Sequence, residues 1–134
     1  MDDRDIEEIL KNSKNIAIVG LSAESSRDSY RVAEYLLHQG YRIFPINPKI
    51  KEWNGIKAYP DLESIDEDAT IDVVDIFRKP ESVTGIVIQS LHLRPKAIWM
   101  QEGIINEEAA AIAKKNGIKV IMDRCMMKEH KKRI

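Results

Sequence analysis

The sequence predicts an α/β fold in which a parallel sheet of five strands is covered by helices on both faces. Segments with apolar strand character alternate along the chain with segments of helical periodicity. The first strand segment, NIAIVG at residues 15–20, is a continuous apolar run that ends in glycine, as expected for a strand buried on both faces. A chain of 134 residues fits one such domain, so we expect a single domain over residues 1–134.

Five segments are expected to form this sheet. The second, YRIFPIN, contains Pro45, which cannot donate a backbone hydrogen bond and favours an edge or terminal position. Right-handed connections and a topological switch beside the first strand predict a Rossmann-like three-layer sandwich with the strand order 3-2-1-4-5. The expected strands span residues 15–20, 41–47, 71–77, 96–100 and 118–122.

The segments between the strands carry helix signals. Asn106 is placed to cap the clearest helix, and Gly40 supplies a stop for an earlier one. Residues 52–66 read instead as a connection with turn signals and room for one helical turn. The expected helices span residues 2–13, 28–39, 80–92 and 106–117, with a last helix after the fifth strand.

Composition limits the class of protein. Charged residues make up 32% and the net charge is -1, which argues against a dedicated nucleic-acid binder. Cys125 is the single cysteine, so no internal disulfide can form, and a reducing cytoplasm fits best. We see no signal peptide and no apolar run near the roughly 20 residues needed to span a membrane. We therefore expect a cytoplasmic protein without a nucleic-acid or membrane partner.

The carboxyl ends of the strands carry most of the unusual residues. Ligands of open parallel sheets bind at this edge, beside the switch in strand direction. Asp72 and Asp75 lie on the third strand itself, where Asp75 is expected to point inward and to be paired. The segments at the expected ligand edge are 20–22, 47–49, 77–79, 101–103 and 123–125.

The turn after the first strand has the spacing of a phosphate-binding loop. Gly20, Ser22 and Ser25 take the positions of G-x-G-x-x-G, with serines in place of the later glycines. A small-residue turn before a helix N-terminus can hold a pyrophosphate, and Arg27 adds a positive charge. Alternatively, Ser25, Ser26 and Asp28 compete only to cap the helix. The pattern alone leaves both interpretations open.

The end of the second strand narrows the choice of ligand. NAD-binding domains typically place an acid there, whereas this chain has Asn47, Pro48 and Lys49. A cation suits a ribose that carries its own phosphate, as in NADP or coenzyme A. The alternative for Lys49 is an exposed loop lysine after an ordinary turn dipeptide.

Taken together, four segments resemble the small stand-alone CoA-binding proteins, which are similar to the CoA-binding domain of the succinyl-CoA synthetase α subunit. The segments recur in order and at the right spacing, and the resemblance covers about residues 12–130. It implies a Rossmann-like fold and a site for coenzyme A. The segments are VGLSAESSRDSYRVAEYLLHQGYRIFPINPK, DVVDIFRKPE, IWMQEGIINEEA and VIMDRC.

The resemblance also implies roles for individual residues. The Gly20-Leu21-Ser22 turn, with Arg27 and Ser29, would receive the phosphates. Asn47, Pro48 and Lys49 would bound the adenosine 3′-phosphate. Phe77 would stack or pack against the ligand, Arg78 would pair with a phosphate, and Gln101, Glu102 and Gly103 would line the path of the pantetheine arm. The pair Arg124-Cys125 closes the last strand, as in members of the family.

The chain departs from the synthetase in ways that bear on catalysis. It lacks the synthetase's phosphate-carrying histidine, because His38, His92 and His130 stand in unrelated places. We therefore do not expect ligase activity from this chain alone. Cys125 is a candidate thiol or disulfide site, since a helix N-terminus and the adjacent Arg124 favour a thiolate. The alternative is a buried structural cysteine.

The leading hypothesis is a binding module for coenzyme A or an acyl-CoA that carries out no catalysis of its own. The alternatives are an NADP- or CoA-dependent redox or acyl-transfer enzyme that uses Cys125, and a non-catalytic subunit of a ligase-like complex. An NADP enzyme would need a substrate region for which few residues remain, which favours binding. No metal site is predicted, and exposed tryptophan or methionine side chains would support a homodimer.

Overall fold

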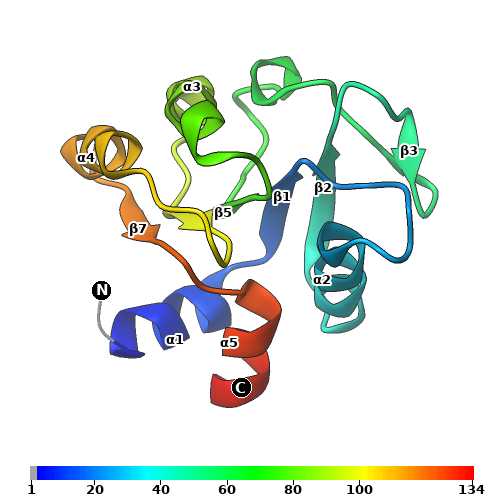
Figure 1. Cartoon of the computed structure of the whole chain (residues 1–134), viewed down its shortest axis with the longest axis horizontal. Coiled ribbons are helices and arrows are strands. Elements are labelled where there is room, and N and C mark those ends of the chain that lie inside the picture. Colours follow the sequence, from blue (N-terminus) through cyan, green and yellow to red (C-terminus); the bar gives the residue numbers. More distant parts are fainter. Residues whose placement is uncertain (1–2) are drawn as a thin grey trace.

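A five-stranded parallel sheet lies between two layers of helices in the computed structural model, which describes residues 3–134 (Figure 1). This confirms the α/β fold class. Every neighbouring pair of strands in the sheet is parallel, and the strand order is β2-β1-β5-β6-β7. The strands are β1 (Asn15–Val19), β2 (Arg42–Ile46), β5 (Val73–Ile76), β6 (Ala97–Met100) and β7 (Lys119–Ile121).

The strand order differs in one respect from 3-2-1-4-5. When the five strands are numbered along the chain, the sheet reads 2-1-3-4-5, so the third strand lies beside the first and the second is at the edge. Pro45 accounts for this arrangement, because a strand with a missing N–H is tolerated at an edge. The outer side of β2 is partly covered by Tyr59, whose N–H donates to Pro45 O at 2.9 Å.

The two helical layers bury two separate apolar clusters. Helices α3 (Val83–Ser90) and α4 (Glu107–Lys115) cover one face of the sheet. Helices α1 (Asp3–Asn12), α2 (Asp28–His38) and α5 (Met126–Arg133) cover the other face (Figure 1). The expected helix over 80–92 is shorter, because 3₁₀ turns at Pro80–Ser82 and Leu91–Leu93 flank α3. None of the helices in the described part of the chain is long and apolar enough to cross a membrane.

Local signals account for the ends of several elements. Asn106 caps α4 as predicted, and its Oδ1 accepts the Ala109 N–H at 2.9 Å. The connection after β2 contains a small antiparallel hairpin, β3 (Glu52–Trp53) and β4 (Ile56–Lys57), and a 3₁₀ turn over Leu62–Ser64. The hairpin turns at Asn54 and Gly55, which both have positive φ, and this is the backbone that an Asn-Gly turn favours.

Candidate functional site

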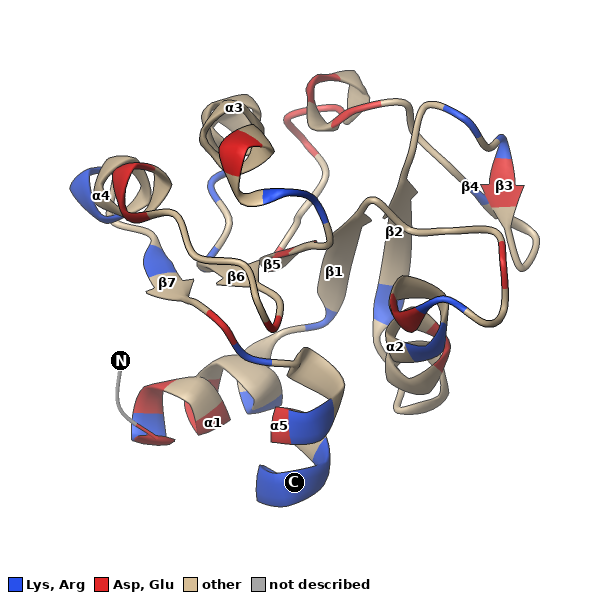
Figure 2. Ribbon diagram, viewed as in Figure 1, with Lys and Arg blue, Asp and Glu red and all other residues tan. Residues whose placement is uncertain are grey.

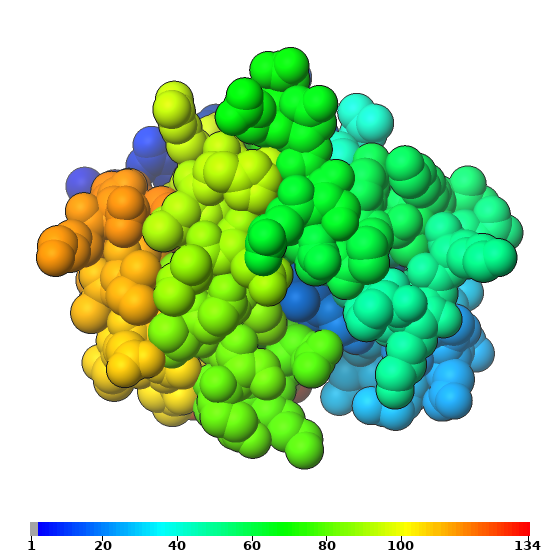
Figure 3. All heavy atoms as spheres, turned by 90° about the horizontal axis from the view of Figure 1, so that it is seen from above, coloured from blue at the N-terminus to red at the C-terminus, as the bar shows by residue number. Residues whose placement is uncertain are grey.

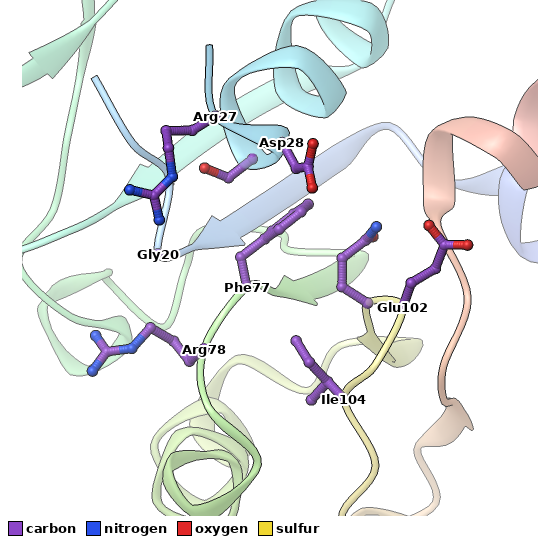
Figure 4. Close-up of a pocket in the computed structure, with 9 residues that line it drawn as sticks. Gly20, Arg27, Asp28, Phe77, Arg78, Glu102 and Ile104 are labelled. Carbon is purple, nitrogen blue, oxygen red and sulfur yellow. The ribbon is translucent and has the colours of Figure 1, made fainter. Parts of the chain in front are cut away.

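A cleft of about 310 Å³ opens at the carboxyl ends of β1, β5 and β6, beside the start of α2 (Figure 4). Six residues expected at a ligand site from the sequence lie together in it: Gly20, Arg27, Ser29, Phe77, Arg78 and Gln101. Glu102, which the resemblance placed on the ligand path, is also there. Two further residues, Asp28 and Ile104, also line the cleft and were not expected at a ligand site from the sequence.

Gly20 lets the first turn lie directly against the end of β5. Its φ is +86°, and a Cβ at this position would lie 2.5 Å from the carbonyl oxygen of Phe77. That contact is too short for a side chain, so the close approach of the two loops requires glycine. Gly20 and Phe77 both line the cleft, which therefore includes this close contact between the ends of β1 and β5.

Serine side chains shape the loop between β1 and α2. Ser29 Oγ accepts the Ser22 N–H at 3.0 Å, and Ser22 Oγ accepts the Glu24 N–H at 3.0 Å. Helix α2 follows Arg27 at its N-cap position and has no hydrogen bond from a capping side chain. The interpretation that serines or Asp28 only cap this helix is therefore wrong. Within residues 3–134 the N-cap residue Arg27 makes no side-chain capping bond to α2, whose first N–H groups are the donors that a helix offers to anions.

Two arginines stand on either side of the Gly20 turn. Arg27 precedes α2 and Arg78 follows β5, and both side chains are exposed (Figure 4). Within residues 3–134 neither guanidinium takes part in an ion pair. Figure 2 shows the basic segment after β5 as a blue stretch that leads to α3. This end of the cleft therefore offers positive charge to a ligand.

The opposite end of the cleft is acidic. Glu102 lies across the cleft from the two arginines, and Asp28 lies between Arg27 and Glu102 (Figure 4). Both carboxylates already have partners, because Lys128 Nζ lies 3.0 Å from Glu102 and Arg31 pairs with Asp28. These pairs are exposed to solvent, which screens them. The cleft is thus polarised, and its free positive charge is confined to one end.

A second cavity, of about 230 Å³, lies on the α3 side of the same edge and shares Arg78 with the first. Its walls are largely apolar. Figure 3 shows blue atoms of the β1 region in a hollow between green segments on this face. Pro48 lines it, as expected for a ligand residue, but the other lining residues carry no sequence motif. They are Val19, Ile46, Pro60, Asp61, Leu62, Ser82, Ile86 and Gln89.

Asn47 and Leu21 support the loops of the site but do not line either cavity. Asn47 Nδ2 donates to the carbonyl oxygen of Leu21 at 2.9 Å, and its Oδ1 accepts the Lys49 N–H at 2.9 Å. These bonds join the first loop to the second. Leu21 is fully buried in the core. Lys49 is exposed next to Pro48, outside both cavities.

The loop after β6 is tied to the end of β7. Gly103 has a φ of +81°, and its N–H donates to Asp123 Oδ1 at 2.7 Å. Gln101 is buried, and its Oε1 accepts the Met126 N–H at the start of α5 at 3.3 Å. Gln101 thus lines the cleft and anchors α5, whereas Gly103 lies outside the cleft.

Cys125 precedes α5 at its N-cap position. Its side chain is 4% exposed and packs in the cluster that contains Trp99 and Met126. It does not line the cleft. This burial agrees with the alternative of a structural cysteine rather than with an accessible thiol.

Asp75 is a buried group that the sequence analysis expected to be paired, and the structure contradicts this. Neither carboxylate oxygen has a hydrogen-bond partner among the described residues, and the residue is 0% exposed. Burial raises the pKa of this carboxyl well above its ordinary value. The group therefore favours its neutral form.

Comparison with known proteins identifies relatives over almost the whole chain. The family model described as CoA binding domain matches residues 14–131. The protein YneT of Bacillus subtilis is 41% identical over 126 residues, which are 94% of this chain and 92% of YneT. The α subunit of an ADP-forming acetate–CoA ligase II from Pyrococcus furiosus is 26% identical, and the match covers 86% of this chain and 27% of that subunit.

Solved structures with the same fold cover almost the whole chain. A hypothetical protein from Pyrococcus horikoshii OT3 superposes with a TM-score of 0.93 and 40% identity, over 98% of this chain and 92% of that chain. Cell-free ID.343 from Thermus thermophilus superposes with a TM-score of 0.93 and 35% identity, over 100% of both chains. The ligase relatives are much longer, since this chain spans only about a quarter of the Pyrococcus furiosus subunit.

Proposed function

Because the chain belongs to the family of CoA-binding domains, we propose that it binds coenzyme A or an acyl-CoA across the carboxyl ends of β1, β5 and β6. The observation that carries this proposal is the pair of unpaired arginines, Arg27 and Arg78, beside the uncapped start of α2. Diphosphates bind where helix N–H groups and guanidinium groups meet. The residues at this edge therefore fit the anionic part of coenzyme A.

The phosphates are held, in this proposal, above the Gly20 turn. Gly20 keeps the turn low against Phe77, Ser29 holds the loop in shape through Ser22, and the two arginines supply charge from both sides. Arginine suits phosphate because its planar fork can donate two parallel hydrogen bonds.

The adenosine end occupies the second cavity, because Arg78 lines both cavities and can contact a diphosphate that passes between them. Apolar walls with a few polar groups are typical of such sites. Pro48 is part of this wall, and Lys49 next to it is the cation that we assign to the 3′-phosphate. Asn47 acts indirectly, since its hydrogen bonds fix the position of this loop.

The pantetheine arm runs past Phe77 and Gln101 towards Glu102, which lies across the cleft from the arginines (Figure 4). That end carries carboxylates and no free positive charge, which suits an uncharged arm with amide donors. We propose binding without catalysis. The chain has no exposed nucleophile in the cleft, because Cys125 is buried outside it.

Calorimetric titration with coenzyme A, dephospho-CoA and NADP tests this function. We expect saturable binding of coenzyme A, weaker binding of dephospho-CoA, and the weakest binding of NADP. Arg78→Gln should reduce the affinity, whereas Lys132→Gln, an exposed change on α5 outside both cavities, should not. Tighter binding of NADP than of coenzyme A would overturn the proposal.

A further inference from the structure

Asp75 is a buried carboxyl for which the binding of coenzyme A, as proposed above, has no direct use. It lies in the central strand β5, and neither oxygen has a partner among the described residues. Buried polar groups nearly always have a partner, and leaving one without a partner costs stability. Asp75 lies close enough to the cleft for its charge to act on a bound ligand.

Asp75 lies directly beneath the cleft. In the register of the sheet it is flanked by Ile18 of β1 and Trp99 of β6, and the Trp99 Nε1 donor is already used by the Arg124 carbonyl at 2.8 Å. Two residues further along the same three strands, the chain reaches the floor of the cleft. A parallel strand rises about 3.3 Å per residue, so the floor lies about 7 Å away. The floor residues are Gly20, Phe77 and Gln101.

The side chain of Asp75 faces the same side of the sheet as Phe77. Side chains alternate along a strand, and Val74 and Ile76 pack in the cluster beneath α3 and α4. Val73 and Phe77 pack in the cluster on the opposite face, beneath α1, α2 and α5. Asp75 lies between these two positions. It is therefore separated from the cleft by one layer of side chains.

Among the described residues, no charged side chain on the neighbouring helices forms a hydrogen bond or an ion pair with Asp75. On α2 and α5, Glu129 forms ion pairs with two arginines, His130 Nδ1 lies 2.7 Å from the Tyr35 hydroxyl, and Cys125 is packed among apolar side chains. α1 contributes apolar residues to this cluster. Burial is the one cause that shifts the pKa of Asp75, and it shifts it upward.

The cleft presents four charged side chains from above. Arg27 and Arg78 have no ion-pair partner within residues 3–134, whereas Asp28 and Glu102 are exposed and paired with Arg31 and Lys128. Solvent screens exposed charges much more strongly than buried ones. At the same distance from a ligand in the cleft, a charge on the buried Asp75 would therefore act more strongly than a charge on the exposed Asp28 or Glu102.

We propose that the proton on Asp75 controls the affinity of the cleft for its anionic ligand. The inference rests on the proposed function, which places the phosphates of coenzyme A above the Gly20 turn, at one side of this floor. When Asp75 loses its proton to solvent, its negative charge repels the phosphates through an interior of low dielectric constant and offsets the two arginines. Linkage is reciprocal, so the bound ligand also holds the proton on Asp75, and binding takes up a proton at any pH where Asp75 of the free protein is ionised.

The test is the affinity for coenzyme A as a function of pH, measured by calorimetry from about pH 6 to about pH 9 on wild type, Asp75→Asn and Asp28→Asn. We expect the wild-type affinity to fall by about fivefold or more towards the alkaline end, and the Asp75→Asn affinity to fall much less. Asp28→Asn, which removes an exposed carboxylate of the cleft, should bind more tightly at every pH and keep the wild-type slope. Identical slopes for wild type and Asp75→Asn would overturn the proposal.

A second measurement uses the wild-type protein alone, so it does not depend on the folding of a variant. The carboxyl carbon resonance of Asp75, followed by NMR in protein with ¹³C-labelled aspartate, reports its titration with and without coenzyme A. We expect the midpoint to move to higher pH when the ligand is present. An unchanged midpoint in the presence of bound coenzyme A would refute the coupling but leave the proposed function intact. Absence of coenzyme A binding at every pH would overturn both.

Discussion

Two aspartates near the central strand β5, one just before it and one close to its carboxyl end, have opposite character. Asp72, at the amino end, accepts the N–H groups of Lys14 and Asn15 at 2.9 Å each and pairs with Lys96 Nζ at 3.5 Å. Asp75, three residues later, has no partner among the described residues and lies beneath the cleft. The amino edge of the sheet is thus closed by satisfied bonds. The carboxyl edge retains free charge and an unpaired buried acid, and this is where we place the ligand.

The largest expected effect comes from removing the satisfied aspartate. Asp72→Ala leaves two backbone N–H groups without their acceptor and takes the ion-pair partner from Lys96. We expect a loss of about 3 kcal/mol in the free energy of unfolding, because each group left unpaired costs about 1–3 kcal/mol. Chemical denaturation measures this loss. A loss below about 1 kcal/mol would show that the amino edge does not depend on this carboxylate.

Replacement of Asp75 should raise the free energy of unfolding, whereas replacement of Asp72 should lower it. Its folded-state pKa lies above that of the unfolded chain, so the wild type is most stable in acid and loses stability as the pH rises from about 4 towards the folded pKa. Asn does not titrate. Across that pH window, the free energy of unfolding of Asp75→Asn should therefore increase relative to that of the wild type by roughly 1–2 kcal/mol for each pH unit. Denaturation curves at several pH values measure the difference. A constant difference between the two proteins would contradict a buried neutral Asp75.

Substitution of Arg78 should lower the affinity for coenzyme A and leave the stability of the protein almost unchanged. It is exposed and has no ion pair within residues 3–134, so Arg78→Gln should change the free energy of unfolding by less than about 0.5 kcal/mol. The same change should lower the affinity for coenzyme A about tenfold, which is a typical value for a charged hydrogen bond to phosphate. Calorimetry and denaturation of one preparation give both values. A stability loss without an affinity loss would make Arg78 a structural residue.

The smallest effect is expected at Lys49, which lies outside both cavities and is exposed. Lys49→Ala should weaken coenzyme A about threefold and dephospho-CoA hardly at all, because a solvent-exposed pair contributes under about 1 kcal/mol. The ratio of the two affinities is the quantity to measure. Equal losses for both ligands would remove Lys49 from the 3′-phosphate.

Much of the fold could be predicted from local patterns. Continuous apolar runs placed the strands correctly, and Asn106 marked the start of α4. The position of the third strand beside the first could not be read in this way, because it depends on the path of residues 50–70 across the sheet edge. Pro45 was the one local sign that the second strand lies at an edge.

A cleft lies at the sheet edge where the sequence placed the ligand, and the binding roles of its residues stay predictions. The carboxyl ends of parallel strands meet at one edge, so Gly20, Phe77 and Gln101 were correctly expected together. Their orientations depend on tertiary hydrogen bonds that no spacing reveals. Leu21 turned into the core, and Asn47 bonds to the backbone of the first loop.

An NMR titration of the ¹⁵N-labelled protein with coenzyme A tests directly whether the ligand binds at the carboxyl edge of the sheet. We expect saturable shifts in the backbone amides of Gly20, Ser29, Phe77 and Gln101, with little change at Asp72 on the opposite edge of the sheet. Shifts confined to the amino edge, or no shifts at any concentration of coenzyme A, would contradict it.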